Sequence, residues 1–445
     1  MYALVDGNNF YVSCERAFRP ALKTRPVVVL SNNDGCAIAR SNEAKALGIK
    51  MGQPWFECRQ LAEEHGVIAL SANFTLYGDM SDRMMSIAAG LGPAQEIYSI
   101  DESFIDLAGV RGDVTARSRV MRERILEWIG IPTGIGIGPT KTLAKLANHV
   151  AKSADRKPGS YPAGLARVCN LGALPQSDLD AVLQATGVGE VWGIGRRIAH
   201  QLSSEGVTSV LQLIQIDPGT VRRRWSVVLE RTVRELQGQQ CVSLDDQPAP
   251  KKEIAFTRSF GQPVRDIEAL IEAVSAFASG TGAKLRKQHS LAGQLLVFIH
   301  TSPFRPGPKY SRSVTVPLRR PTADTHLLVA AAVAGLQAIY RPGFDYIKAG
   351  VMLLELQDDA VHQGELALEG DYEGDRVGEC AVERACERTV LMGTLDKLND
   401  RYGRGTLMVA SEGLKGVKRQ WSMRQQRRTP HYTTNWNEMP VAKAS

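Results

Sequence analysis

A short polar stretch near the middle of the sequence divides the chain into two different parts. Residues 245–252 read Asp-Asp-Gln-Pro-Ala-Pro-Lys-Lys, a proline-bearing composition that is typical of a linker between domains. The 445 residues of the chain suffice for about three domains. Because 43% of the residues are hydrophobic and 23% are charged, we expect globular units on both sides of the linker.

The part after the linker has the element pattern of a small α+β domain. Hydrophobic periodicity predicts the order β-α-β-β-α-β, with strands at 254–260, 291–301, 311–318 and 345–356 and helices at 265–288 and 323–340. A further helix is predicted at 384–399, behind an acidic spacer.

The part before the linker mixes strands and helices and then becomes helical. The patterns predict strands at 2–6, 26–30 and 133–138, a strand–turn–strand at 97–107, and helices at 42–47, 117–129 and 140–152. Residues 171–240 read as helical throughout. The predicted fold class is therefore a multidomain α+β protein.

Three carboxylates stand where they could carry chemistry. Asp6 ends the first predicted strand, and Asp101 and Glu102 lie in the turn of the strand–turn–strand segment. Clustered carboxylates repel one another unless cations lie between them, and oxygen-only ligands suit Mg²⁺. Ordinary acids in surface turns look the same, and the residues taken alone favour that interpretation.

A glycine-bearing turn at 191–197, Val-Trp-Gly-Ile-Gly-Arg-Arg, is a second candidate site. Such a turn between two helices exposes backbone N–H groups at a helix N-terminus, where a phosphate binds well. Arg196 and Arg197 add positive charge. The pattern resembles a helix-hairpin-helix, which contacts the DNA backbone without reading sequence. The alternative is a tight turn needed only for packing.

Charge is unevenly distributed along the chain. The formal net charge is +7, from 54 basic and 47 acidic residues. Residues 401–445 hold nine Lys and Arg against two acids, whereas residues 355–388 hold eleven acids against three Arg. A basic tail behind an acidic spacer indicates a polyanion or an acidic partner protein. A solvated tail that serves only solubility is the alternative.

Two classes of protein are excluded by the sequence. The longest apolar stretch, around 327–336, is too short to cross a bilayer. The seven cysteines are scattered and form no Cys-x-x-Cys pair, which indicates neither a disulfide framework nor a zinc site. We expect a cytoplasmic protein.

Three separated motifs resemble those of the Y-family, the lesion-bypass DNA polymerases. They are Asp-Gly-Asn-Asn-Phe-Tyr-Val-Ser-Cys-Glu at 6–15, Ser-Ile-Asp-Glu-Ser at 99–103, and Gly-Ile-Gly-Pro-Thr-Lys-Thr-Leu-Ala-Lys-Leu-Ala at 136–147. Asn-Asn-Asp-Gly-Cys at 32–36 and the ending of the chain, 401–434, are similar to the subgroup that forms the catalytic subunit of bacterial DNA polymerase V. The resemblance covers the whole chain.

The resemblance implies a right-hand polymerase with a little finger and a C-terminal extension. The expected parts are a palm at 1–22 and 73–165, fingers at 23–72, a helical thumb with the helix-hairpin-helix at 166–242, a linker at 243–250, a β-α-β-β-α-β little finger at 251–355, and an acidic spacer with a basic extension at 356–445.

The resemblance also implies a two-metal reaction. Asp6, Asp101 and Glu102 would be catalytic and would hold two Mg²⁺ ions, with Gly7 as a further ligand through its carbonyl. The primer 3′-hydroxyl would attack the α-phosphate of a deoxynucleoside triphosphate. The expected function is error-prone, template-directed translesion synthesis without proofreading, in an SOS-type response to DNA damage.

Five residues would bind the incoming nucleotide: Phe10, Tyr11, Asn42, Lys45 and Lys152. Tyr11 stands where the family keeps a steric gate against the ribose 2′-hydroxyl, although core packing beside Phe10 is the alternative. Lys152 would contact the triphosphate. Asn42 and Lys45 depart from the commoner Tyr and Arg of the family, and Lys45 lacks the bidentate fork of an arginine.

Primer-template DNA would contact Gly193, Gly195, Arg196, Arg197 and Arg258, the last through a template phosphate. The resemblance adds a nucleoid-associated location and three protein partners: a processed UmuD-type dimer, a RecA filament and the sliding clamp.

Two segments would serve these partners. Gln363, Leu366 and Leu368 resemble the peptide that docks on the clamp, without its usual aromatic end. The basic tail, with Arg424, Arg427 and Arg428, would bind DNA, the UmuD-type protein or RecA.

Two other functions remain open. A non-catalytic scaffold would bind primer-template and recruit partners, but the three carboxylates are all retained. A nucleotidyl cyclase on a similar palm would explain neither the hairpin nor the α+β domain.

Overall fold

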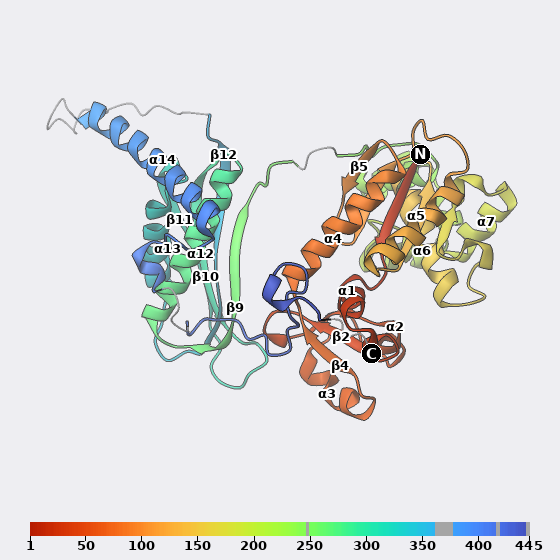
Figure 1. Cartoon of the computed structure of the whole chain (residues 1–445). Helices are drawn as coiled ribbons and strands as arrows, with labels where there is room; N and C mark the ends of the chain where they lie inside the picture. The colour runs from red at the N-terminus through yellow and green to blue at the C-terminus, as the bar shows by residue number, and fades with distance from the viewer. Residues whose placement is uncertain (246–248, 361–376, 415–418, 442–445) are drawn as a thin grey trace. The chain divides into compact units, whose positions relative to one another are not determined.

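The computed structural model divides the chain into two compact units (Figure 1). It describes residues 1–245, 249–360, 377–414 and 419–441, with side chains left out at 377–387. The first unit comprises Met1–Pro248 together with Gln426–Ser445, and the second comprises Ala249–Gln425. The end of the chain therefore belongs to the unit in which the chain begins.

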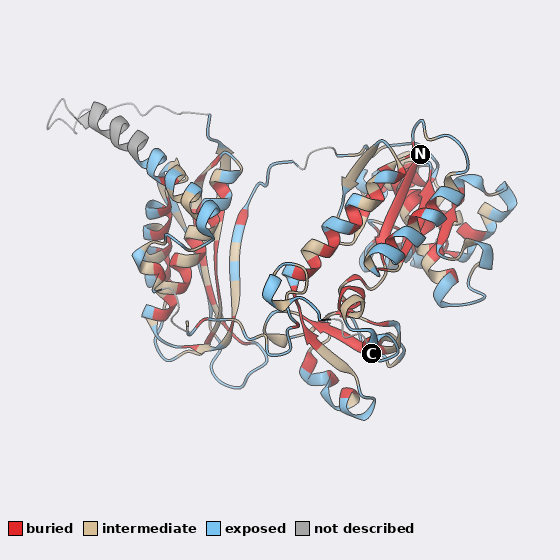
Figure 2. Cartoon of the chain, in the orientation of Figure 1, coloured by how far each residue is buried: buried red, intermediate tan, exposed pale blue. Residues whose placement is uncertain are grey.

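A five-stranded sheet with the order β5-β6-β1-β7-β8 forms the centre of the first unit. Its strands are β1 (Tyr2–Gly7), β5 (Ala94–Ile97), β6 (Glu102–Asp106), β7 (Thr133–Gly138) and β8 (Val168–Asn170). All six residues of β1 are buried (Figure 2), because helices cover both faces of the sheet.

Alternate residues of β1 face two different layers. Ala3 and Val5 belong to a core with α1 (Phe10–Phe18), α4 (Phe74–Ala88) and α5 (Val114–Ile129). Leu4 packs on the opposite face with Phe104 and with Ala144 of α6 (Lys141–Arg156). Because side chains alternate along a strand, Asp6 lies on the face that α6 covers.

Helix α6 lies directly against the backbone of β7. A methyl group at Gly136 would lie 2.1 Å from the backbone nitrogen of Asn148 and 2.2 Å from the carbonyl oxygen of Ala144. The alternating glycines of β7 are therefore required by this close approach.

A smaller three-stranded sheet, β3-β2-β4, accompanies the central one. It consists of β2 (Val27–Leu30), β3 (Ala37–Arg40) and β4 (Ile68–Ser71), with α2 (Asn42–Ala46) and α3 (Trp55–Glu64). The helical prediction for 171–240 is confirmed by α7 (Gln176–Ala185), α8 (Arg196–Ser204), α9 (Val210–Ile214), α10 (Pro218–Arg224) and α11 (Val227–Leu236).

The second unit is built on a four-stranded antiparallel sheet with the order β11-β10-β12-β9. The strands are β9 (Ile254–Val264), β10 (Ser290–Thr301), β11 (Ser311–Thr322) and β12 (Tyr346–Asp358), and the helices are α12 (Ile267–Lys287) and α13 (Thr325–Ile339). All six elements predicted from the periodicity are confirmed. Helix α14 (Val377–Tyr402) is longer than predicted.

No helix in the described part of the chain is both long and apolar enough to cross a membrane. The predicted turn around Asp101 is present, but Glu102 already begins strand β6.

The packing of α6 on β7 can be tested with Gly136→Ala. We expect this change to lower the free energy of unfolding by about 1–3 kcal/mol, because the added methyl group overlaps helix backbone that cannot move without displacing α6. Urea unfolding followed by circular dichroism measures it. Gly164→Ala is the matched control, since nothing lies within 4 Å of its added carbon; equal stability of the two variants would contradict the packing.

Candidate active site

The backbone brings three carboxylates to one end of the central sheet. Asp6 on β1 is the register partner of Glu102 on β6. The N–H of Gly7 donates a 2.8 Å hydrogen bond to the carbonyl of Asp101. Residues separated by almost a hundred positions in the sequence therefore become neighbours. A site that combines Asp6 with Asp101 and Glu102 requires this.

Asp6 lies in the interior at this point, with 5% of its surface exposed. Burial is the largest of the causes that together raise the pKa of Asp6 to about 6; the negative charges of Glu102 and Asp101 add to the rise, and Lys152 opposes it. The three carboxylates are therefore close enough to repel one another.

Each carboxylate has its own polar partner. Asp6 forms an ion pair with Lys152 and accepts a 2.9 Å hydrogen bond from the Asn148 amide. Glu102 forms a 2.9 Å ion pair with Lys145. Asp101 accepts a 2.7 Å hydrogen bond from the Ser99 hydroxyl.

One face of α6 supplies most of these partners. Lys145, Asn148 and Lys152 are spaced i, i+3 and i+7, which places them on the same side of a helix. The sequence analysis identified Lys152 but missed Lys145 and Asn148. Their helical spacing directly after a glycine-alternating strand is the pattern that could have identified them.

The donor atoms of this cluster fit a hard divalent cation. Carboxylate oxygens are the ligands that Mg²⁺ prefers, and a bound cation would compensate the negative charges of Glu102 and Asp101 that act on Asp6. Within the described ranges, however, no three Asp, Glu, His or Cys side chains are arranged around one metal position. The three carboxylates are instead engaged by lysine, amide and hydroxyl groups.

Tyr11 is half-buried on α1 beside the carboxylates. Its ring stacks on Tyr77 with 4.5 Å between the centroids and meets Phe74 edge-on at 5.9 Å. Phe10 is only 3% exposed and belongs to the core. Its predicted contact with a nucleotide is therefore not favoured by its position, and its ring packs beneath the site.

A cluster of cations faces the carboxylates. Lys45 on α2 donates a 2.5 Å hydrogen bond to the side-chain oxygen of Asn9, and the Asn9 amide donates to Asn42. Burial, followed by repulsion from Arg156, Arg40 and Lys152, lowers the pKa of Lys45 to about 8. This cationic cluster, Lys45, Arg40, Lys152 and Arg156, is suited to a polyanion.

Asn9, Arg40 and Arg156 were not among the predicted site residues. Asn9 has a left-handed backbone, with φ of 48°, which asparagine tolerates better than most residues. Neither the contact of Asn9 with Asn42 nor the approach of Arg156 to Lys45 follows from a local pattern, because both join elements that are remote in the sequence.

The glycine turn of the predicted helix-hairpin-helix leads directly into helix α8. Gly193 adopts a φ of +86°, and Gly195 caps the N-terminus of α8. Ile194 is buried, whereas Arg196 and Arg197 are exposed. Both arginines therefore lie exposed at the N-terminus of α8.

Trp192 anchors this hairpin beside the carboxylates. Its ring lies 5.6 Å from that of Tyr98 and 6.0 Å from that of Phe104, between ring centroids. The Lys145 ammonium lies 4.3 Å from the Tyr98 centroid and 5.3 Å from that of Trp192. The lysine that pairs with Glu102 is therefore held by aromatic rings from the sheet and from the hairpin.

Arg258 lies on the helix-covered face of the second unit's sheet. It is the register partner of the buried Ala349, and directly opposed residues share a face. Its guanidinium lies 5.1 Å from the Phe256 ring centroid and donates to the sulfur of Met423. The expected phosphate contact is therefore not favoured by this position.

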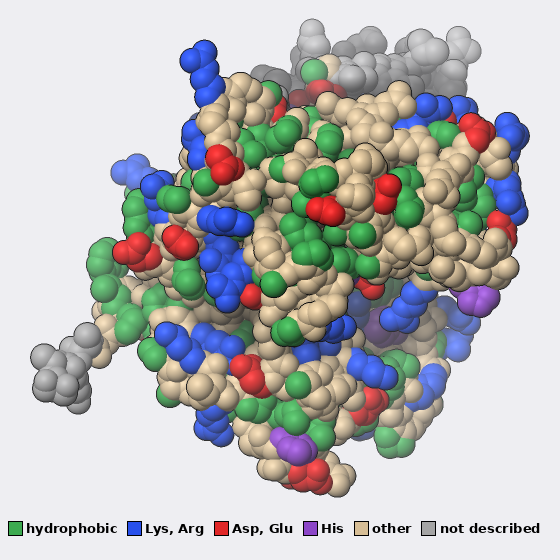
Figure 3. All heavy atoms as spheres, turned by 90° about the vertical axis from the view of Figure 1, so that its right-hand side faces the viewer, with side chains coloured by type: hydrophobic (Ala, Val, Ile, Leu, Met, Phe, Trp, Pro, Cys, Tyr) green, Lys and Arg blue, Asp and Glu red, His purple; other side chains and the backbone are tan. Residues whose placement is uncertain are grey.

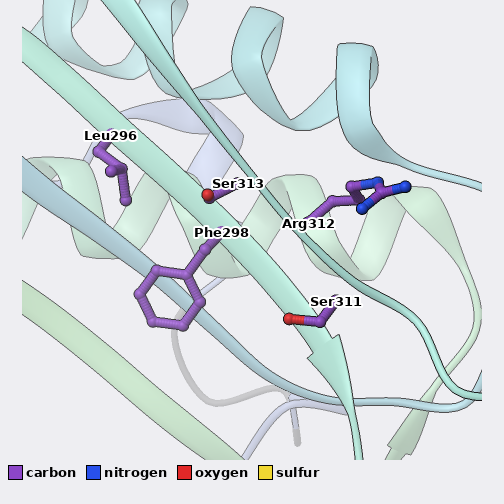
Figure 4. A pocket seen from close by; sticks show the side chains of 5 residues that line it. All are labelled: Leu296, Phe298, Ser311, Arg312 and Ser313. Atoms are coloured by element: carbon purple, nitrogen blue, oxygen red, sulfur yellow. The ribbon is translucent and has the colours of Figure 1, made fainter.

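Strands β10 and β11 of the second unit carry a shallow hollow of about 450 Å³. Leu296 and Phe298 from β10 line it together with Ser311, Arg312 and Ser313 from β11 (Figure 4). An aromatic ring, two hydroxyls and one guanidinium are compatible with a nucleic-acid backbone.

The remaining predicted residues lie elsewhere. Gln363, Leu366 and Leu368 are outside the described residues. Arg427 is exposed, with its guanidinium 5.6 Å from the Trp55 ring centroid. On the face shown in Figure 3, Lys and Arg side chains are spread widely, with Asp and Glu between them.

Sequence comparisons connect the chain with a known group. The profile of the impB/mucB/samB family matches residues 5–149, and the profile of its C-terminal domain matches residues 251–366. A third profile, described as a domain of unknown function, matches residues 389–442.

Full-length relatives support the same relationship. The chain is 40% identical to protein ImpB of Salmonella typhimurium over 100% of both chains. It is 41% identical to protein UmuC of Salmonella typhimurium strain LT2 over 99% of both. DNA polymerase IV of Moorella thermoacetica is 27% identical over 90% of this chain and 93% of the relative.

Solved structures show the same fold. A Y-family DNA polymerase chimera has a TM-score of 0.62 at 18% identity and covers 80% of this chain and 99% of its own. An insertion ternary complex of Dbh DNA polymerase has a TM-score of 0.50 at 19% identity, over 79% of this chain and 98% of its own.

The cationic cluster predicts a pH-dependent affinity for polyphosphate. Lys45 is cationic below its pKa of about 8, so it loses charge as the pH rises from about 7 to 9. We expect the affinity for tripolyphosphate to fall by about three- to tenfold over this range, as measured by calorimetry. Lys45→Arg keeps its charge, so its affinity should fall less; identical pH profiles for the two proteins would contradict the assignment.

Proposed function

Because the chain belongs to the impB/mucB/samB family and has the fold of Y-family DNA polymerases, we propose that it is a translesion polymerase whose Asp6, Asp101 and Glu102 carry a two-metal nucleotidyl transfer. The observation that supports the site most directly is the backbone register that makes these three carboxylates neighbours. The primer 3′-hydroxyl attacks the α-phosphorus of a deoxynucleoside triphosphate, and pyrophosphate leaves.

Asp6, Asp101 and Glu102 would hold the metal ions, with the Gly7 carbonyl as a further candidate ligand. Two bound Mg²⁺ ions supply Lewis-acid chemistry, by lowering the pKa of the attacking hydroxyl and stabilising the leaving group. The chain's own contribution is to keep the buried Asp6 beside the partly exposed Asp101 and Glu102, which Asn148 supports through its 2.9 Å hydrogen bond to Asp6.

The cationic cluster binds the triphosphate in this proposal. Lys152 links the carboxylates to the cationic cluster, because it forms an ion pair with Asp6 and repels Lys45. Asn42 and Lys45 are both fixed by Asn9. Tyr11 borders the sugar and excludes a 2′-hydroxyl, with Tyr77 behind its ring.

The division into palm, fingers, thumb, linker and little finger follows the same proposal, at the boundaries given above. The hairpin at Gly193 and Gly195, with Arg196 and Arg197, contacts the DNA backbone. In the second unit, the hollow on β10 and β11 is a better candidate for a DNA contact than Arg258, because Arg258 lies on the helix-covered face.

The proposed context is an SOS-type response to DNA damage. The UmuC and MucB relatives support it by their close identity. The processed UmuD-type dimer, the RecA filament and the sliding clamp are the proposed partners, with residues 363–368 as the candidate clamp peptide and the basic tail as a candidate surface for the others.

The catalytic assignment is tested by Asp101→Asn. We expect primer extension across an abasic site, with Mg²⁺ and four deoxynucleotides, to fall by more than about 100-fold because a metal ligand is weakened. Asp106→Asn is the matched control on strand β6, where Asp106 accepts its hydrogen bond from the backbone of Ala108.

The assay should be run with and without a UmuD-type protein and activated RecA. Activity only in their presence supports the proposed partners. Intact DNA binding without extension in any combination would overturn the polymerase assignment and favour the scaffold.

The hairpin assignment is tested by Arg196→Ala with Arg197→Ala. We expect DNA affinity to weaken uniformly across sequences, because two phosphate contacts are lost. The slope of the logarithm of the binding constant against the logarithm of the salt concentration should become shallower by up to about 2. Fluorescence anisotropy at several salt concentrations measures both. The pair Arg222→Ala and Arg223→Ala, exposed on α10, is the control for net charge; an equal loss there would contradict the assignment.

A further inference from the structure

The last segment of the chain is built into the first unit beside the nucleotide site. Residues 426–445 belong to that unit, and residues 427–432, here called the tail clasp, contact α1, β4 and the start of α4. The profile that covers this segment is described only as a domain of unknown function.

Backbone pairing fixes the beginning of the tail clasp. The Ser71 N–H donates to the carbonyl of Arg427, and the Arg427 N–H donates to the Ser71 hydroxyl, both at 3.0 Å. Ser71 and Arg428 form a parallel bridge. The clasp therefore continues the small sheet at the end of its edge strand β4.

Thr429 enters a buried polar network. Its hydroxyl donates a 3.1 Å hydrogen bond to the Glu15 carboxylate, which also accepts a 2.7 Å bond from the Tyr77 hydroxyl. Asn73 donates to the carbonyls of Thr429 and Pro430. Glu15 is fully buried and Thr429 is 5% exposed.

The buried carboxylate of Glu15 depends on the groups that donate hydrogen bonds to it. Burial raises the pKa of Glu15, and the hydrogen bonds from Tyr77 and Thr429 oppose this rise. A buried polar group that loses a donor is costly, so its remaining partners adjust. The tail therefore supplies one of the two hydroxyls that hold Glu15 in place.

The same network leads directly to Tyr11. Glu15 lies one helical turn after Tyr11 on α1. Tyr77, which Glu15 holds by its hydroxyl, stacks on the Tyr11 ring at 4.5 Å with an interplanar angle of 16°. At the other end of α1, Tyr432 of the clasp stacks on Phe18 at 4.8 Å.

We infer that the tail clasp is a positioning element for the sugar side of the nucleotide site: Thr429 fixes Glu15, Glu15 fixes the Tyr77 hydroxyl, and the Tyr77 ring fixes Tyr11. The inference rests on the proposed function, because it assumes that Tyr11 borders the sugar. Its consequence is that the C-terminal tail, remote in the sequence, sets the discrimination between deoxyribonucleotides and ribonucleotides.

Two substitutions interrupt the chain of contacts without enlarging any side chain. Thr429→Val removes the hydroxyl that donates to Glu15, and Tyr77→Phe keeps the stacked ring but removes its bond to Glu15. Single-nucleotide insertion gives kcat and KM for a deoxynucleotide and for the matching ribonucleotide. We expect both variants to increase the relative use of the ribonucleotide by about three- to tenfold, chiefly through KM.

Thr433→Val is the matched control. Thr433 is in the same tail, but its hydroxyl has no hydrogen-bond partner among the described residues. We expect this variant to keep the selectivity of the unchanged protein. DNA affinity and the circular dichroism spectrum are measured for every variant, and Tyr77→Phe decides the test if Thr429→Val does not fold.

Tyr11→Ala separates failure of the inference from failure of the proposed function. If Tyr11→Ala does not increase ribonucleotide use, the gate assignment itself is wrong. If it does, while Thr429→Val and Tyr77→Phe keep the original selectivity, the positioning role is overturned. An equal loss of activity toward both sugars, with an unchanged ratio, also overturns it, because that is the effect of a merely structural contact.

Discussion

The close approach of α6 to the glycine-lined strand β7 is the contact on which the site depends. Any side chain at Gly136 would overlap the helix backbone, so the helix lies nearer to the sheet than ordinary side-chain packing allows. This short distance lets Asn148 and Lys152 reach Asp6, and lets Lys145 reach Glu102. Without it, the buried Asp6 and the partly exposed Glu102 would lose their lysine partners.

The charges of the site are arranged in two layers. Asp6 on β1, Glu102 on β6 and the preceding Asp101 form the inner layer, and the cationic cluster from α2, α6 and β3 forms the outer one. Lys152 pairs with Asp6 and repels Lys45. Burial, and after it repulsion within each layer, raises the pKa of Asp6 and lowers the pKa of Lys45. Cations at the inner layer and a polyphosphate at the outer one would relieve both repulsions together, which is the electrostatic requirement of nucleotidyl transfer.

The sequence predicted the parts of this structure that local patterns encode. Periodicity located every element of the second unit's sheet domain, and the strand end at Asp6 and the turn at Asp101 indicated the carboxylate edge. The rest depends on packing between distant segments. Arg258 lies on the edge strand β9, where exposed and half-buried residues alternate only weakly. The sequence pattern therefore does not show which face of the sheet Arg258 occupies, and only its pairing with Ala349 does. Lys145, Asn148 and Asn9 acquire their roles only when α6 and α2 approach β1 and α1.

The course of the chain gives α1 a double function. This nine-residue helix carries Tyr11 near its start and Glu15 and Phe18 further along, so it faces the nucleotide site at one end and the returning tail at the other. Since the second unit is inserted between residues 248 and 426, the tail can pair with β4 only after the chain has passed through that whole unit. A helix this short has little freedom to absorb a displacement at Glu15 without moving Tyr11, because the two residues are a single turn apart and share Tyr77. Completion of the tail clasp is therefore coupled to the geometry of the site by the rigidity of one helical turn.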